Sequence, residues 1–301
     1  MTGDVLVVPA RVSAGGAAWR RWLQLGGLLR FREARIGIGI FCAMVVLVVI
    51  GPFIAPYPPE QVGAGLPSSG PSSQHWLGTD NLGRDVLSRL LAGGWSIILV
   101  PVVVVAITMV ISIVIGLASG YLGAWPDAVV TRILDVVLAI PQFLIILVIV
   151  AGFGTSTIVL ISAIVLAYFP SSSRVVRGAV QAVAPLEFVQ AARARGDSLS
   201  WILSREVLPN IMPSLLVEMA MRFNFAIVTA ASLSFLGLGI QPPTPNWGVM
   251  VSENQGLLFV HPWAALAPAL AIAVLAISVH LIADALTQYY GRRELSVGSQ
   301  S

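Results

Sequence analysis

Long runs of apolar residues without a charged side chain alternate with short polar segments along most of the chain. A helix needs about 20 apolar residues to cross the roughly 30 Å hydrocarbon core of a bilayer. The runs therefore predict six membrane-spanning helices, at residues 36–55, 96–118, 134–151, 158–170, 215–240 and 263–283. The third and fourth come from one run divided by Gly152 and Gly154, which predicts a helical hairpin. We expect an all-α polytopic membrane protein.

These spans divide the chain into five segments. We expect an N-terminal tail, a first span, an external segment with an interfacial helix, a core of five spans and a C-terminal tail, at residues 1–35, 36–55, 56–94, 95–284 and 285–301. Six crossings put both tails on one side. Arginines near span ends are retained in the cytoplasm, and 14 of the 17 fall on the side of the tails. Both tails are therefore predicted to be cytoplasmic.

Composition supports this class and excludes others. The chain is 57% hydrophobic and 10% charged, far from the soluble average of about 25% charged. All 17 basic residues are arginine, so the chain lacks the lysine of a phosphate-binding P-loop. The net charge of +3 is spread along the chain, which does not favour nucleic-acid binding. We expect a protein with no nucleotide site, cofactor or metal site and no enzymatic activity of its own.

A long cytoplasmic segment, residues 175–209, interrupts the pattern of short loops. Unstructured loops of that length are uncommon and usually functional. The segment holds one helical pattern that ends at Gly196 and a second that we expect to end at Pro209. It therefore predicts a helix, a turn and a helix beneath the membrane, where a partner could transmit force. The alternative is a solvated loop whose arginines only mark topology.

This loop resembles the EAA signature of permease subunits of bacterial ABC importers, which docks onto a separate ATPase. The resemblance implies that the loop couples to the ATPase through Gln190, Ala191, Ala192, Gly196, Leu208 and Pro209. Two positions depart from the family: Gln190 replaces its glutamate, and Glu206 stands near Leu-Pro where the family has an apolar residue. Arg193 and Arg195 are further candidates, either for contact with the ATPase or as topology markers.

Four other segments are similar to the C-type permease subunit of dipeptide and oligopeptide importers. They are HWLGTDNLGRDVLSRLLAG (75–93), GLASGYLGAWPDAVVTRILDVVLAIPQF (116–143), ASLSFLGLG (231–239) and PNWGVM (245–250). The resemblance implies the type I importer fold in a bacterial cytoplasmic membrane. It also implies a homologous B-type permease, two ATPase subunits that bind ATP and Mg²⁺, and an extracytoplasmic substrate-binding protein. The substrate would be a peptide, or else a glutathione-like peptide or a nickel chelate.

Two charges fall inside the fifth span. Glu218 and Arg222 are four residues apart on one helix face, so they can neutralise each other. Intramembrane charges usually face a cavity or a partner. The pair is therefore a candidate to line the translocation path, and a purely structural pair near the inner interface is the alternative.

Small residues and a proline mark two further spans. Pro141 should kink the third span because it has no N–H, and the resemblance also places it at the path. Whether that kink acts as a hinge is left open. Gly116 and Gly120 form a small-residue face that favours close helix packing.

The external segments hold further candidates. Trp247, Met250 and Glu253 lie between the last two spans, where they contact either the binding protein or only cap the bundle. In the segment before the second span, Asp80 is placed to cap a helix. Asp85 and Arg89 are expected to pair on one face of it.

Two other classes of protein remain as alternatives. An ion-coupled secondary transporter should show inverted repeats and acidic residues near the midplane, and these are not evident. A membrane-embedded enzyme would need a nucleophile with its base, or a metal cluster, and no recognisable spacing provides one.

Overall fold

The computed structural model describes residues 25–298, which are almost entirely helical and contain no strand. The elements are η1 (Leu25–Arg30), α2 (Arg32–Ile54), α3 (Val86–Ala92), α4 (Trp95–Leu122), α5 (Ala124–Leu138), α6 (Gln142–Phe153), α7 (Thr157–Val183), α8 (Glu187–Ala194), α9 (Leu199–Trp201), η2 (Ile202–Val207), α10 (Leu208–Phe235), α11 (Trp247–Asn254), η3 (Gln255–Leu257) and α12 (Trp263–Gly298). The N-terminal tail before residue 25 lies outside the described residues.

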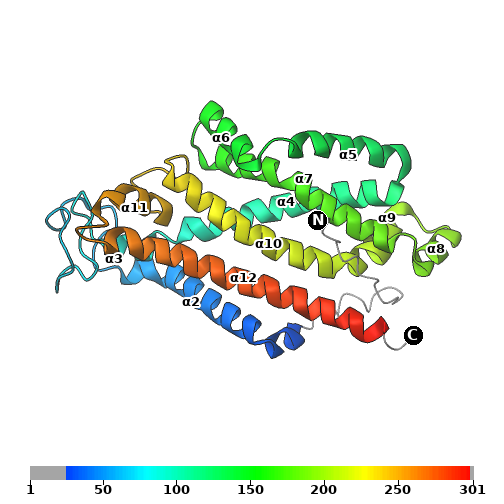
Figure 1. The fold of residues 1–301 in the computed structure, drawn as a ribbon, viewed down its shortest axis with the longest axis horizontal. Coiled ribbons are helices and arrows are strands. Elements are labelled where there is room, and N and C mark those ends of the chain that lie inside the picture. The colour runs from blue at the N-terminus through cyan, green and yellow to red at the C-terminus, as the bar shows by residue number, and fades with distance from the viewer. Residues whose placement is uncertain (1–24, 299–301) are drawn as a thin grey trace.

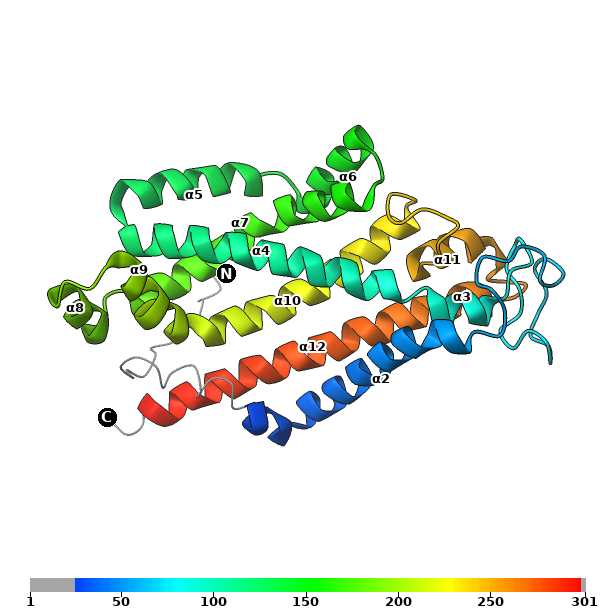
Figure 2. The ribbon, with the colours of Figure 1, turned by 180° about the vertical axis from the view of Figure 1, so that it is seen from behind.

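The helices form an elongated bundle (Figure 1). In this view α2 and α12 form one side, α4, α7 and α10 the middle, and α5 and α6 the opposite side. Helices α3 and α11 gather at one end, and α8 and α9 at the other, as the reverse view also shows (Figure 2). Below, the end with α3 and α11 is called the α11 end, and the opposite end is called the α8 end.

The all-α polytopic fold is confirmed. Five helical segments are long and apolar enough to cross a membrane, and the bent pair of α5 and α6 provides a sixth crossing if it is counted as one span. The predicted hairpin is also present, because α6 ends at Phe153 and Gly154 opens the turn that leads into α7. Ser156 caps the first turn of α7 by accepting a hydrogen bond from the Val159 N–H.

Helix α7 extends well beyond the predicted fourth span. It runs from Thr157 through Pro170 to Val183, so part of the segment expected as a loop from residue 175 is helical. Near the proline, the Ser112 hydroxyl donates to the Phe169 carbonyl and the Ser171 hydroxyl to the Tyr168 carbonyl.

The third span is broken at Pro141, where we expected only a kink. Helix α5 ends at Leu138, α6 begins at Gln142, and the two are bent by 75°. Pro141 stands at the cap position of α6, where its missing N–H costs no helical hydrogen bond. The span predicted at residues 134–151 therefore combines the end of one helix with most of another.

Helices α4 and α7 pack at close range through two glycines, as the small-residue pattern predicted. A Cβ on Gly116 would lie 2.6 Å from the Val176 Cβ, and one on Gly120 would lie 2.8 Å from the Val180 Cβ. Both valines are buried in the largest apolar cluster, which joins α4, α6, α7 and α10. The missing methyl groups therefore let the two backbones approach.

We expect Gly116→Ala to lower the free energy of unfolding by roughly 1–3 kcal/mol, because the added methyl must push α7 away. Gly178→Ala is the matched control, since its Cβ would meet nothing within 4 Å and alanine favours a helix by about 0.5–1 kcal/mol over glycine. Thermal unfolding of both variants in detergent gives the comparison. Equal midpoints for the two variants would contradict close packing at Gly116.

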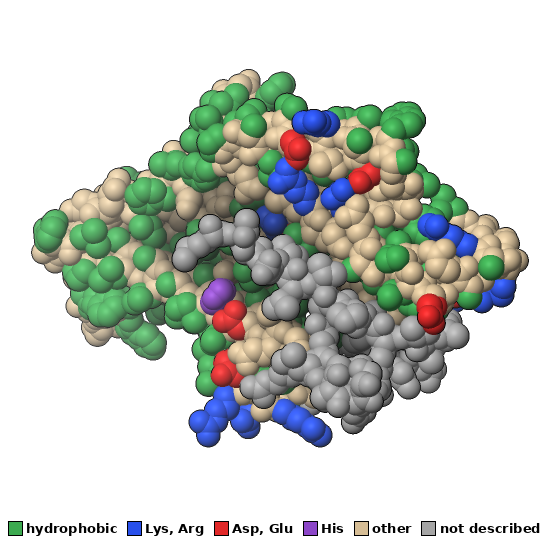
Figure 3. Space-filling model, turned by 45° about the vertical axis from the view of Figure 1, so that its right-hand side comes forward, with side chains coloured by type: hydrophobic (Ala, Val, Ile, Leu, Met, Phe, Trp, Pro, Cys, Tyr) green, Lys and Arg blue, Asp and Glu red, His purple; other side chains and the backbone are tan. Residues whose placement is uncertain are grey.

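Large apolar side chains cover the sides of the bundle, as a surface in contact with lipid requires. Phe53, Phe153 and Ile158 are among the most exposed. On the face shown in Figure 3, charged side chains lie in the upper centre, on the right and at the bottom, whereas hydrophobic and uncharged atoms cover the far left. Charge is thus concentrated away from one end of the bundle.

Candidate functional site

The first candidate site is the helical loop at the α8 end, residues 187–201. Helix α8 buries Val189 and Ala192 against the bundle and leaves Gln190 and Ala191 exposed. Gly196 ends it with a φ of 81°, a left-handed conformation that glycine adopts without strain. The predicted helix, turn and helix are therefore present, and Ala192 is a packing residue on their inner face.

Two of the polar candidates in this loop, Gln190 and Arg193, have hydrogen-bond partners within the chain. Gln190 Nε2 donates to the carbonyl of Ala184 over 3.1 Å, which closes the end of α7. Arg193 Nε donates to the Tyr121 hydroxyl over 2.7 Å, and its guanidinium carbon lies 4.3 Å from the centre of that ring. Helix α8 is thereby fixed to the last turn of α4.

Arg195 connects the two helices of the loop. Its Nη2 lies 2.8 Å from Asp197 Oδ2 and 3.9 Å from Glu206 Oε1. Glu206 is buried, so its departure from the family pattern places an acid where it faces a cation of the same loop. The arginine is more than half exposed and remains accessible from outside.

The loop continues into α10 without a break, which corrects the expected helix end at Pro209. The helix runs from Leu199 to Phe235. Within η2 the Leu208 N–H donates to the Leu203 carbonyl, five residues earlier, which is the spacing of a π-helix. Pro209 follows directly, and the wider turn accommodates its missing donor. Pro209 is buried, and Leu208 is half-buried.

Two exposed apolar residues of the loop were missed from the sequence. Leu199 and Trp201 are about half exposed at the α8 end, and Arg205 stacks 5.3 Å from the centre of the Trp201 ring. Large apolar side chains exposed together on a surface can mark a protein contact. Their position inside an otherwise polar segment is the signal that could have identified them.

The second candidate site lies between α7 and α10. Arg222 Nε donates to Glu218 Oε1 over 2.5 Å, which confirms the pairing of these two charges. Ser172 Oγ donates to the same carboxylate oxygen over 2.8 Å. Tyr168 lies beside the pair, with its ring centre 5.7 Å from the Arg222 guanidinium carbon. Pro141 stands at the break between α5 and α6, where the next residue, Gln142, donates to the Ser171 hydroxyl of α7.

At the α11 end, a buried ion network joins the segment before α4 to α11. Asp80 Oδ2 accepts from Arg84 Nε over 2.6 Å and from Arg89 Nη1 over 2.5 Å. Glu253 Oε2 completes the network by accepting from Arg84 Nη2 over 2.7 Å and Arg89 Nη1 over 2.8 Å. Asp80, Arg84 and Arg89 are almost fully buried, so the network is a structural connection across more than 160 residues of sequence.

This network corrects two expectations about α3. The residue that caps α3 is Asp85, which accepts from the Ser88 N–H, whereas Asp80 caps the preceding turn. Asp85 Oδ1 lies 2.8 Å from His75 Nδ1, so Arg89 pairs with Asp80 and Glu253 instead. Asp85 and Arg89 therefore each pair with residues outside α3 and not with each other.

Of the three candidates on α11, two are buried in the core and one is partly exposed. Trp247 and Met250 are fully buried, and Trp247 Nε1 donates to the Leu90 carbonyl over 2.7 Å. In this structure both side chains pack inside the bundle. Glu253 keeps a fifth of its side chain exposed beside the ion network.

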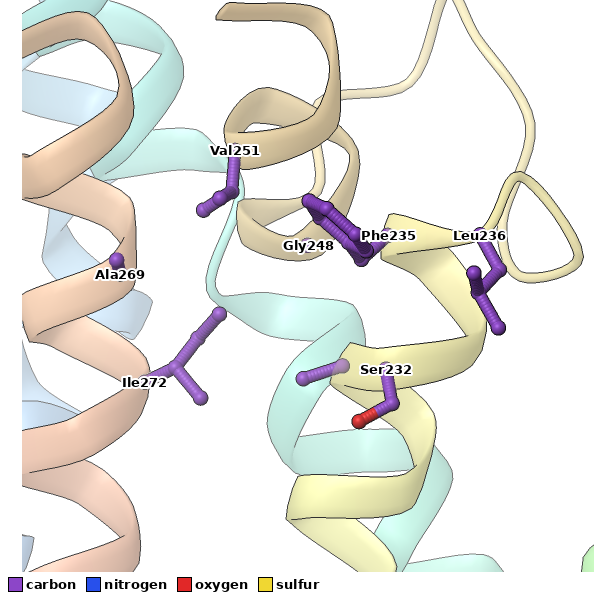
Figure 4. Close-up of a pocket in the computed structure, with 8 residues that line it drawn as sticks. Ser232, Phe235, Leu236, Gly248, Val251, Ala269 and Ile272 are labelled. Atoms are coloured by element: carbon purple, nitrogen blue, oxygen red, sulfur yellow. The ribbon is translucent and has the colours of Figure 1, made fainter. Parts of the chain in front are cut away.

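An apolar pocket of about 380 Å³ lies beneath α11, between α10 and α12 (Figure 4). Its walls are Ala231, Ser232, Phe235, Leu236, Gly248, Val251, Ala269 and Ile272. The Ser232 hydroxyl donates to the Val228 carbonyl of its own helix, so the pocket is lined almost entirely by apolar groups. A peptide's charged ends would find no partner in it.

His261 gives this end of the bundle a pH dependence. Burial lowers the pKa of His261, because the charged imidazolium is poorly solvated there. The unfolded chain takes up a proton near pH 6.5 and the folded chain only at lower pH. Stability should therefore be complete above about pH 6.5 and fall as the pH drops through that range toward the lowered pKa.

Thermal unfolding between pH 7.5 and 5 tests this prediction. We expect His261→Gln to flatten the fall of the unfolding midpoint. His280→Gln is the matched control because the His280 side chain is half exposed, and it should follow the wild type. The same slope in all three proteins would exclude His261 as the source.

Comparison with known proteins adds a family. Residues 112–293 match the family described as "Binding-protein-dependent transport system inner membrane component". The glutathione transport system permease protein GsiD of Pectobacterium atrosepticum is 34% identical over 89% of this chain and 87% of its own length. GsiD of Escherichia coli is 38% identical over 85% and 86%. The dipeptide transport system permease protein DppC of Alkalihalophilus pseudofirmus is 32% identical over 86% and 85%.

Proposed function

The chain belongs to the family of binding-protein-dependent transport system inner membrane components, and from that premise we propose that it is the C-type permease subunit of an ATP-driven peptide importer in the bacterial cytoplasmic membrane. The relatives named for glutathione and for dipeptides both support a peptide substrate. The partners we propose are a homologous B-type permease, two ATPase subunits and an extracytoplasmic binding protein.

The observation that carries the proposal is the helical loop at the α8 end. It presents Ala191, Leu199 and Trp201 outward and is joined by a continuous helix to α10. In an ATP-driven importer whose ATPases are separate subunits, force must reach the permease through such a surface. We propose that ATP binding draws this loop and its counterpart in the B-type permease together, which turns the pathway outward, and that hydrolysis resets it.

The proposed topology places the α8 end in the cytoplasm, with both tails on that side. Arginines of the loop and of the last turns of the chain support this orientation through the positive-inside bias. Under this proposal the α11 end, with its buried ion network, is extracytoplasmic. The exposed part of the Glu253 side chain is then a candidate contact for the loaded binding protein.

Reconstitution tests the proposal. The chain, its B-type partner and the ATPase subunits are placed in proteoliposomes with the binding protein, and uptake of labelled dialanine and glutathione is measured. We expect uptake that requires ATP and is lost with hydrolysis-deficient ATPase subunits. Uptake that persists without the ATPases would indicate an ion-coupled secondary transporter. Uptake of a nickel chelate instead of either peptide would keep the architecture and change the substrate.

A further inference from the structure

The Glu218–Arg222 pair lies on α10 (Leu208–Phe235), part of a helix that is long and apolar enough to cross a membrane. Charges within a spanning helix are costly to insert, and they almost always face the bundle interior or a water-filled cavity. The contact of Ser172 with Glu218 holds α7 against α10. Arg222 neutralises the carboxylate, and the pair keeps further hydrogen-bonding capacity.

The guanidinium of Arg222 is held in place but only partly used. Within the described part of the chain its Nε donates to Glu218, and neither terminal nitrogen is placed in a hydrogen bond. The side chain is 14% exposed, so these donors retain access to the open side of the pair. Tyr168 lies beside the guanidinium, and its hydroxyl is 2.5 Å from Thr229 Oγ1, which fixes the ring.

Glu218 is also only partly used. Both Arg222 Nε and Ser172 Oγ donate to its Oε1, which leaves Oε2 without a hydrogen bond among the described residues. The side chain is 9% exposed. The pair therefore has two adjacent groups that can bind a ligand. The terminal nitrogens of Arg222 are positively charged donors, and Glu218 Oε2 is a negatively charged acceptor.

The side on which the pair opens cannot contact lipid without a large cost. Met219 and Phe225, which flank the pair on α10, are exposed on the same helix and show that this region of α10 is uncovered in the single chain. Charges avoid hydrocarbon, so lipid does not cover this side of the pair. We expect it to face a partner subunit and the water of a pathway between the two subunits.

We propose that Glu218 and Arg222 form a binding site on the pathway for zwitterionic peptides. The Arg222 terminal nitrogens would bind the C-terminal carboxylate, since a guanidinium fork matches carboxylate geometry. The free oxygen of Glu218 would accept from the N-terminal ammonium of a short peptide. With a dipeptide such as dialanine, a neutral pair thus receives a neutral zwitterion, and no net charge is buried. This inference rests on the proposed function.

Equilibrium binding tests the site without the binding protein. The assembled complex is held with ATP and vanadate, and peptide binding is measured by saturation-transfer NMR. The probe is dialanine, compared with its C-terminal amide and its N-acetyl form. Loss of one charged hydrogen bond should weaken binding roughly tenfold. We expect the amide on the wild type to bind as weakly as the free acid on Arg222→Gln.

Two further variants keep the test decisive. Arg132→Gln removes the same charge from an exposed position on α5 and should bind the free acid like the wild type. The double variant E218Q/R222Q removes both charges together, which avoids an unpaired buried acid if Arg222→Gln alone does not fold. It should bind the free, amidated and acetylated peptides equally.

Two results would overturn the inference. In the first, the wild type binds all three peptide forms equally. In the second, Arg222→Gln separates the chain from the B-type permease on size exclusion, which would assign the pair to subunit contact. Either result can occur while ATP-driven uptake is intact, whereas absence of ATP-driven uptake in the wild-type complex contradicts the proposed function itself.

Discussion

Arg89→Met is expected to lower the free energy of unfolding by about 3–5 kcal/mol, because it removes one partner from a buried ion pair. Arg89 is 1% exposed and bonds both Asp80 and Glu253. Without it, two acids share the single cation Arg84 in an environment that solvates charge poorly. The link between α11 and the segment before α4 should weaken first.

Thermal and denaturant unfolding of the purified protein provide the measurement, with two comparisons. The double variant R89M/E253Q restores the charge balance and should recover part of the loss. Arg174→Gln breaks the half-exposed pair of Arg174 with Asp135, which should cost at most about 1 kcal/mol. If Arg89→Met unfolds at the same midpoint as Arg174→Gln, the buried network contributes little to stability.

The second large effect is expected from Ala191→Trp. Ala191 is exposed on the outward face of α8, beside Gln190 and opposite the buried Val189. A docked partner packs against such a surface with the density of a protein interior. An indole inserted there should cost roughly 1–3 kcal/mol, which is about 10- to 100-fold in affinity for the ATPase.

Copurification of the ATPase subunits and ATP-dependent peptide uptake test this effect. Ala128→Trp adds the same side chain at an exposed position on α5, away from the loop, and should assemble normally. Assembly and uptake of Ala191→Trp at wild-type levels would show that α8 is not the docking surface. The melting midpoints of both variants should match the wild type because neither position is buried.

Much of this fold is visible in the sequence because the bilayer imposes a simple rule on composition and length. The spans follow from apolar runs, and the contact of Gly116 with α7 follows from the small-residue spacing. The Glu218–Arg222 pair was predictable for the same kind of reason, since residues four apart on a helix are neighbours. Local periodicity was enough in each case.

What could not be predicted depends on contacts between distant segments. Arg89 pairs with Glu253, 164 residues away, and nothing near either residue indicates that choice. The Ser112 hydroxyl of α4 bonds the Phe169 carbonyl of α7, a contact across 57 residues that neither segment indicates by itself. Burial of Trp247 likewise follows from the position of α11 over the bundle, which its own short segment does not specify.

The unbroken helix from Leu199 to Phe235 has a geometrical consequence for transport. Trp201 at one end and Arg222 near the middle are separated by about 30 Å at 1.5 Å per residue. A rigid rod of that reach converts a tilt of about 10° at the loop into a sideways displacement of about 5 Å at Arg222. A small rotation imposed at the α8 end would therefore displace the Glu218–Arg222 pair by roughly the width of a peptide backbone.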